Sequence, residues 1–184
     1  MPRLPALLAV LWLAACAAPP PAPEARQIAA LAHAITALGP DVSATEATRA
    51  AQIAYRYPLR LAAQYGITDP PLIHNTKVNM GLRPRGLCWH WAQDLEKRLA
   101  QEGFQTLTLH RAIANFENPL RIEHSTVIVS AKGDDMFHGI VLDAWRKGGR
   151  LTWVPTLEDT AYKWRPRRAV LTAKRKRRAL RSAQ

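Results

Sequence analysis

The chain has 184 residues, 48% of them hydrophobic, and a formal net charge of +12. This length suffices for one domain with an apolar core and excludes a second domain of ordinary size. Nine cationic residues and no acidic residue lie from Arg165 onward, and Arg3 adds one more positive charge near the start of the chain. Residues 16–164 therefore carry a charge of only +2. The globular part is therefore nearly neutral, and the net charge belongs to a terminal segment.

The first sixteen residues have the composition of a bacterial export signal. Arg3 gives a positive start, Ala6 to Leu13 form a short apolar run, and Leu13-Ala14-Ala15-Cys16 follows. The run is too short to span a bilayer, which predicts a cleaved signal and not a transmembrane helix. The last four residues resemble the lipobox of bacterial lipoproteins, which implies that Cys16 becomes the lipidated mature N-terminus. The alternative is an ordinary signal in which Cys16 is discarded.

The segment after Cys16 separates this signal from the rest of the chain. Residues 17–23 hold four prolines, a composition typical of an extended tether. We therefore divide the chain into a signal peptide (1–15), a lipidated cysteine with its tether (16–23), a single domain (24–164) and a basic tail (165–184). Ala17 stands in place of the aspartate of an inner-membrane retention signal, so we expect an anchor in the outer membrane that faces the periplasm.

Two helices are predicted at the start of the domain. Apolar residues recur at helical spacing over Glu24–Leu38, and Gly39-Pro40 ends that pattern. A second helix begins at Ser43, which has capping-box spacing to Glu46, and runs to about Tyr57. Pro58 bends or ends this helix because proline lacks the backbone N–H.

Cys88 lies at the start of a third predicted helix. It follows Thr68–Arg85, where prolines and glycines in turn contexts predict a loop. The helix ends at Gly103. Its apolar positions are spaced by four, three and four residues and share one buried face: Cys88, Ala92, Leu95 and Leu99.

Cys88 has no disulfide partner in an exported chain whose other cysteine is Cys16. An unpaired cysteine outside the cytoplasm is either buried and inert or retained for its chemistry. The first turn of a helix stabilises an anion through its unpaired N–H groups and its dipole, which favours the thiolate. The spacing also suits an ordinary core cysteine, so both interpretations stay open at this point.

Two apolar strands follow the helix. His124–Val129 and Ile140–Trp145 are rich in β-branched residues, with turn residues between them. A two-residue turn at Gly133-Asp134 would place His124 opposite Asp143, close enough for the carboxylate to orient the imidazole. A bulge or a longer turn would shift this pairing by one or two residues.

A cysteine at a helix start, followed by histidine and aspartate on strands, resembles the transglutaminase-like branch of the papain-like enzymes. The resemblance covers about 70 residues, from Arg85 to Trp153, and bacterial transglutaminase-like cysteine proteinases are the most similar members. It implies an α+β fold with N-terminal helices and a central cysteine-bearing helix packed on a small antiparallel sheet. It also implies that Cys88 is the nucleophile, His124 the general base and acid, and Asp143 the residue that orients His124.

The resemblance implies cysteine-dependent cleavage of a protein or peptide amide, with water or an amine as the acyl acceptor. Leu82 departs from the papain pattern, in which a side-chain amide precedes the nucleophile and holds the oxyanion. Asn79 is our candidate for that donor, with Asn75 and Trp89 as alternatives. The histidines lack metal-ligand spacing, so we expect no metal and no cofactor.

Two predictions concern the partner of the basic tail and an alternative in which the domain has no catalytic activity. An exported protein meets little nucleic acid, so anionic lipid or cell-wall polymer is the expected partner of residues 165–184, unless the tail is only a solvated, partly helical segment. The same fold can also serve as a catalytically inactive binding or scaffolding lipoprotein.

Overall fold

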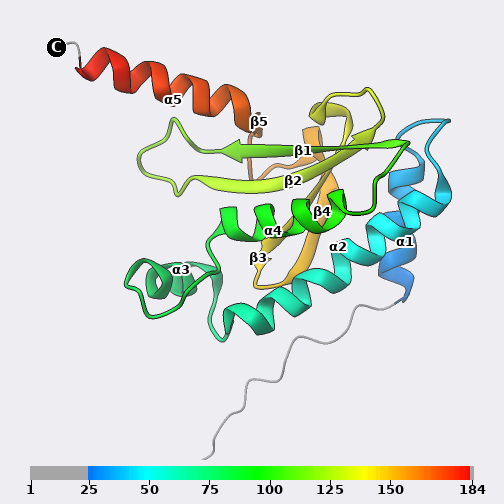
Figure 1. Cartoon of the computed structure of the whole chain (residues 1–184), viewed down its shortest axis with the longest axis horizontal. Coiled ribbons are helices and arrows are strands. Elements are labelled where there is room, and N and C mark those ends of the chain that lie inside the picture. The colour runs from blue at the N-terminus through cyan, green and yellow to red at the C-terminus, as the bar shows by residue number, and fades with distance from the viewer. Residues whose placement is uncertain (1–24, 183–184) are drawn as a thin grey trace, which may run out of the picture.

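The computed structural model describes residues 25–182 and shows an α+β fold (Figure 1). The predicted signal peptide, Cys16 and the tether lie outside the described residues. No helix within residues 25–182 is long and apolar enough to cross a membrane. The helices are α1 (Ala25–Thr36), α2 (Ala44–Tyr65), α3 (Pro71–Asn79), α4 (Cys88–Ala100) and α5 (Arg167–Ser182). The strands are β1 (Leu107–Ala114), β2 (His124–Ala131), β3 (Ile140–Lys147), β4 (Arg150–Pro155) and β5 (Arg165–Pro166).

The five strands form one antiparallel sheet in the order β4-β3-β2-β1-β5. The strand order follows from three consecutive hairpin connections, β1-β2, β2-β3 and β3-β4, and from β5, which returns to pair with β1. The segment assigned from its charge to a tail therefore begins inside the sheet and continues as α5, which extends away from the body (Figure 1). Sequence reasoning predicted none of β1, β4 and β5.

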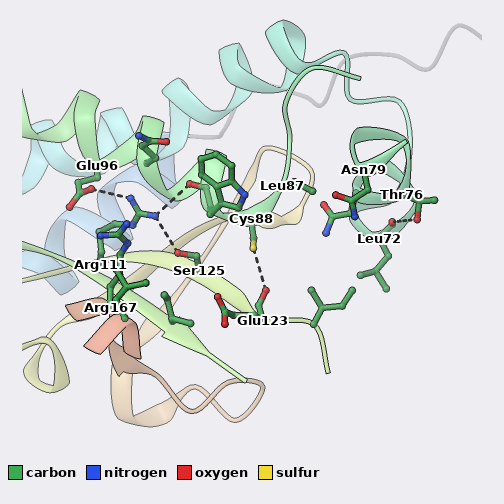
Figure 2. Close-up of a pocket in the computed structure, with 16 residues that line it drawn as sticks. Leu72, Thr76, Asn79, Leu87, Cys88, Glu96, Arg111, Glu123, Ser125 and Arg167 are labelled. Atoms are coloured by element: carbon green, nitrogen blue, oxygen red, sulfur yellow. Dashed lines mark hydrogen bonds and ion pairs between the residues drawn. The ribbon is translucent and has the colours of Figure 1, made fainter. Parts of the chain in front are cut away.

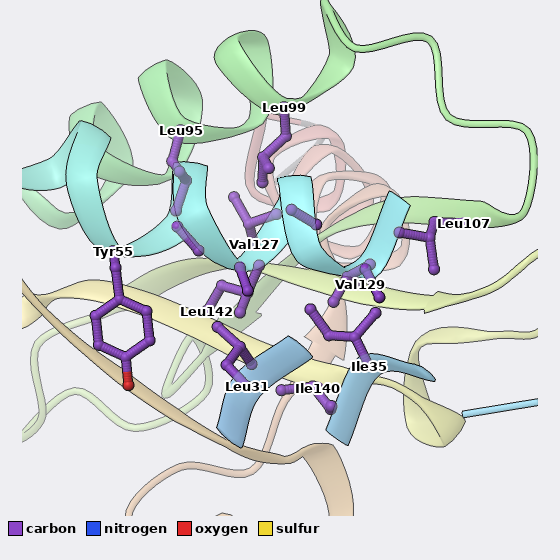
Figure 3. Close-up of a cluster of buried hydrophobic side chains, with 14 of the residues drawn as sticks. Leu31, Ile35, Tyr55, Leu95, Leu99, Leu107, Val127, Val129, Ile140 and Leu142 are labelled. Atoms are coloured by element: carbon purple, nitrogen blue, oxygen red, sulfur yellow. The ribbon is translucent and has the colours of Figure 1, made fainter. Parts of the chain in front are cut away.

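The apolar core lies between the sheet and helices α1, α2 and α4 (Figure 3). Side chains alternate along a strand, so one face of β2 and β3 meets the helices while the other face meets the segment around Trp164. Both faces are covered, which explains why β2 and β3 are buried along nearly their whole length. The core includes Leu31, Ile35, Leu95, Leu99, Val127, Val129 and Leu142.

Helix α2 does not end at Pro58 but continues to Tyr65. Proline inside a helix costs about 3 kcal/mol. The extra turns bury Leu61 and Tyr65 against Trp91 and so offset this cost. Ser43 does cap the helix through its side chain, whereas the Glu46 carboxylate turns to the backbone of residues 105 and 106.

A helix also replaces half of the loop predicted over Thr68–Arg85. Helix α3 begins with Pro71 at its first position, where the fixed φ of proline suits a helix and its missing N–H costs nothing. Two polar side chains of this helix, His74 and Asn75, are buried toward the body. Two of the prolines that indicated a loop, Pro70 and Pro71, therefore mark a helix start.

Candidate functional site

Cys88 is a free thiol at the first residue of α4, as predicted. Its side chain is 7% exposed and lines a cavity of about 680 Å³. The sulfhydryl lies 3.5 Å from the carbonyl oxygen of Glu123, just before β2 begins (Figure 2). The thiol is therefore buried from bulk solvent but open to a cavity large enough for part of a peptide.

The turn before Cys88 is held by side chains of α4. The indole N–H of Trp91 donates to the carbonyl of Gly86 at 2.8 Å, and Nδ1 of His90 accepts from the backbone N–H of Gly86 and of Leu87, both at 3.2 Å. A Cβ on Gly86 would lie 2.3 Å from Nε2 of His74, and its φ of 125° also requires glycine. His90 accepts only when neutral, and burial, aided by Arg85, lowers its pKa accordingly.

His124 and Asp143 meet by a pairing displaced from the predicted one. Val127 lies opposite Leu142, two residues from the predicted register, because a 3-10 helix at Met136–His138 lengthens the turn. A shift of two preserves the face on which each side chain lies. Nε2 of His124 therefore still reaches Oδ2 of Asp143, at 2.5 Å.

The other ring nitrogen of His124, Nδ1, is buried and has no hydrogen-bond partner. Burial by itself would lower the pKa of His124. The charge and hydrogen bond of Asp143, together with the Cys88 thiol, outweigh burial and raise that pKa to about 9. The imidazole is thus held by a carboxylate through Nε2, while Nδ1 is left free to carry a proton.

Asp143 is surrounded by donors. Its carboxylate accepts from the backbone N–H groups of Trp145 and Arg146, and from Nε of Arg146 at 2.6 Å. Arg146 in turn pairs with Asp159 through both terminal nitrogens. Burial would raise the pKa of Asp143, but His124 and Arg146 hold it below its usual value. Asp143 therefore remains a carboxylate although it is only 2% exposed.

Aromatic rings enclose the imidazole of His124. The ring centroids of Trp145, Tyr162 and Trp164 lie 4.7, 4.5 and 5.4 Å from it. These rings keep water from the hydrogen bond between His124 and Asp143 and so strengthen it. Sequence reasoning missed Arg146, Tyr162 and Trp164. Only Arg146 carried a signal, its position three residues after Asp143.

Two asparagines of α3 line the cavity opposite Arg111 and Ser125. Figure 2 shows Asn79 on that side, across from Arg111, with Cys88 between them. Asn79, the predicted oxyanion donor, is exposed at the end of α3. Asn75 is buried, and its Oδ1 accepts from the indole N–H of Trp145 at 3.1 Å, which leaves the amide NH₂ as its donor. Asn75 is thus the more firmly positioned of the two.

Two further tryptophans, Trp153 and Trp89, are not part of the group formed by Cys88, His124 and Asp143. Trp153 donates to the hydroxyl of Tyr55 within the core, and Trp89 is a half-exposed residue at the rim of the cavity. No group of three or more metal-ligating side chains occurs among residues 25–182.

Comparison with known proteins does not add to this description. The chain matches no family model, no curated protein and no solved structure. The functional argument therefore depends on the geometry of Cys88, His124 and Asp143.

Proposed function

We propose that the protein is a cysteine-dependent hydrolase or acyltransferase that acts on a protein or peptide amide. One observation carries the proposal. The buried imidazole of His124 is hydrogen-bonded to Asp143 through Nε2, its Nδ1 has no hydrogen-bond partner, the Cys88 thiol contributes to its raised pKa, and Cys88 opens to a cavity. An inert core cysteine requires neither a buried charged imidazole nor an adjacent cavity.

The arrangement supports an acyl-transfer mechanism. Nδ1 of His124 takes the proton of the Cys88 thiol, and the thiolate attacks the carbonyl carbon of the amide. The tetrahedral intermediate collapses when the C–N bond breaks and the imidazolium gives its proton to the leaving amine. Water, deprotonated by His124, then attacks the thioester and releases the acid and the thiol. An amine in place of water would give a transferase.

Charge that develops on the carbonyl oxygen needs donors near Cys88. The backbone N–H of Cys88 is not used by α4, because the first N–H groups of a helix have no partner within it. The NH₂ group of Asn75 lines the same cavity and is held by Trp145. We assign these two groups to the oxyanion, with Asn79 as the exposed alternative.

The order of the elements supports a transglutaminase-like arrangement. The cysteine begins helix α4, the histidine begins β2, and the aspartate lies on the adjacent antiparallel strand β3. We extend the proposal to an envelope protein anchored by lipid at Cys16. That part depends on the sequence of residues 1–16 alone.

Thiol alkylation tests the proposal without knowledge of the substrate. The full chain is treated with iodoacetamide between pH 5 and 9, and labelling of Cys88 is followed by mass spectrometry, so that Cys16 does not interfere. We expect Cys88 to react at pH 6 at least about tenfold faster than a free cysteine, because the imidazolium stabilises the thiolate.

The matched variant is His124→Gln, which keeps a polar side chain at the start of β2. It should remove the fast reaction at pH 6 while the far-ultraviolet circular dichroism spectrum stays unchanged. A Cys88 that reacts only after urea unfolding, or at the same rate with and without His124, contradicts the proposal and favours an inactive binding protein.

A further inference from the structure

Helix α5 forms part of the wall of the cavity that holds Cys88. Its first residue, Arg167, and Leu171 one turn later both line that cavity. Figure 2 shows Arg167 beside Arg111, on the side of Cys88 away from α3. From there the helix extends away from the body (Figure 1). The segment with most of the positive charge therefore starts at the proposed active site.

The orientation of α5 is fixed by contacts with the loop between β1 and β2. Val170 is buried, Lys174 pairs with Glu123, and Arg177 pairs with Glu117 at 3.5 Å. Glu123 also lines the cavity, so Lys174 neutralises a carboxylate at the cavity wall. These contacts fix which face of the helix lies toward the cavity.

The cavity-facing side of α5 is cationic along its whole length. Residues spaced by four, three, four and three positions share one side of a helix. We call this set the α5 stripe: Arg167, Leu171, Lys174, Arg178 and Arg181. The opposite side contains Ala169, Ala173 and Leu180, with Lys176 as its one charge. Helix α5 has eight cationic residues and no acidic one, and the stripe holds four of them.

Carboxylates at the cavity are already paired. Glu96 binds Arg111 at 3.1 Å, and Glu123 binds Lys174. Among residues 25–182, no acidic partner is found for Arg178 or Arg181. The cavity and the stripe together therefore present an excess of positive charge to whatever enters along α5.

We propose that the α5 stripe binds an acidic segment of the polypeptide substrate and guides it to Cys88. This inference depends on the proposed function for the reaction and names its substrate class. From Arg167 to Arg181 the helix rises about 21 Å, which an extended peptide spans with about six residues. The substrate is thus a protein segment with acidic residues within about six positions on one side of the cleaved bond.

A membrane surface fits the stripe less well. An interfacial helix needs a broad apolar face of large side chains, whereas the side of α5 away from the stripe has Leu180 as its one large apolar residue, beside two alanines and Lys176. A bilayer that bound the stripe would also cover the entrance to the cavity. The positive charge of the α5 stripe therefore favours an elongated acidic ligand that lies along α5 and enters the cavity.

The test measures binding of a fluorescent twelve-residue peptide rich in glutamate, with a glutamine-rich peptide of equal length as its control. The full chain is compared with two double variants of equal charge: Arg178→Gln with Arg181→Gln on the stripe, and Arg175→Gln with Lys176→Gln off it. We expect the stripe variant to weaken binding about fivefold and the other by less than about twofold. Binding should also fall as salt increases.

A second measurement links binding to the cavity. Bound acidic peptide should slow alkylation of Cys88 in the wild-type chain but not in the stripe variant, and circular dichroism should show that α5 persists in both variants. Equal weakening by the two variants overturns the inference. Binding of phosphatidylglycerol vesicles that depends on the stripe, without peptide binding, also overturns it. Stripe-dependent peptide binding with an unreactive Cys88 would instead contradict only the proposed reaction.

Discussion

Two buried carboxylates, Glu46 near the start of α2 and Asp143 on β3, show how similar burial serves different ends. Glu46 is 8% exposed and Asp143 is 2% exposed. Burial acts to raise the pKa of each, but hydrogen bonds hold the pKa of Glu46 below its usual value, and the charges and hydrogen bonds of His124 and Arg146 do the same for Asp143. Burial and a lowered pKa therefore do not distinguish a structural carboxylate from a functional one.

The partners make the difference. Glu46 accepts from the backbone N–H groups of Gln105 and Thr106 and from the Thr106 hydroxyl, none of which titrates near neutral pH. Asp143 accepts from His124, which titrates and also interacts with a thiol at a cavity. A buried carboxylate indicates chemistry when one of its donors can pass a proton to an accessible group.

Removal of each carboxylate gives the largest expected contrast. Glu46→Ala leaves three donors unpaired and should lower the free energy of unfolding by about 2 kcal/mol, with little change in the alkylation rate of Cys88. Asp143→Ala leaves the buried imidazole of His124 without its carboxylate and removes one of the two carboxylates bound by Arg146, and it should cost about 3 to 5 kcal/mol. It should also slow alkylation at pH 6 by at least about tenfold.

The variant Asp143→Asn is the control in case Asp143→Ala does not fold. It preserves shape but removes the negative charge that raises the pKa of His124, so the imidazolium supports the thiolate less and alkylation of Cys88 at pH 6 should be slower than in the wild type. Unchanged alkylation in both Asp143 variants would show that the two carboxylates have equivalent structural roles.

The pH dependence of the free energy of unfolding should also differ between the His124–Asp143 pair and the Glu46 region. The pKa of His124 rises from 6.5 to about 9 on folding, so the stability from its charged form is complete below pH 6.5 and is lost as the pH approaches 9. The loss is on the order of 3 kcal/mol. Urea unfolding at pH 6 to 9 measures it, and His124→Gln should remove it. Glu46→Gln should leave this alkaline loss intact.

Arg146 provides a smaller contrast within the Asp143 region. Arg146→Met retains an unbranched apolar side chain but removes the charge-assisted hydrogen bonds to Asp143 and Asp159, which should lower the free energy of unfolding by about 2 kcal/mol. The matched control is Arg49→Met at a more exposed pair with Glu102, 3.8 Å apart, where we expect less than about 1 kcal/mol. Chemical unfolding at pH 7 measures both, and equal costs would show that the Arg146 pairs add nothing through burial.

The helix caps give the smallest contrast. Ser43 caps α2 beside Glu46, and His90 accepts the N–H groups before Cys88 at the start of α4. Ser43→Ala and His90→Ala should each cost about 1 kcal/mol in urea unfolding. Only His90→Ala should also change the alkylation rate of Cys88, because that cap positions the turn from which the thiol projects. A change in both variants would contradict this local role.

Sequence patterns predicted much of the secondary structure. Apolar spacing placed Cys88 at the start of a helix, and β-branched runs located β2 and β3. Proline was the least reliable signal. Pro58 lies inside α2 and Pro71 starts α3, because the cost of a proline depends on what the surrounding helix buries.

The sequence by itself determined that His124 and Asp143 lie on neighbouring strands after the cysteine-bearing helix, and the structure showed that the register shift is two residues, which keeps both side chains on the same face. It also determined where the charge is concentrated. Only the tertiary structure decided which residues complete the site. Arg146 binds both Asp143 and Asp159, and Asp159 accepts from Trp164; a local sequence pattern does not record these contacts with the segment of Asp159 and Trp164, which meets β3 only in the folded chain.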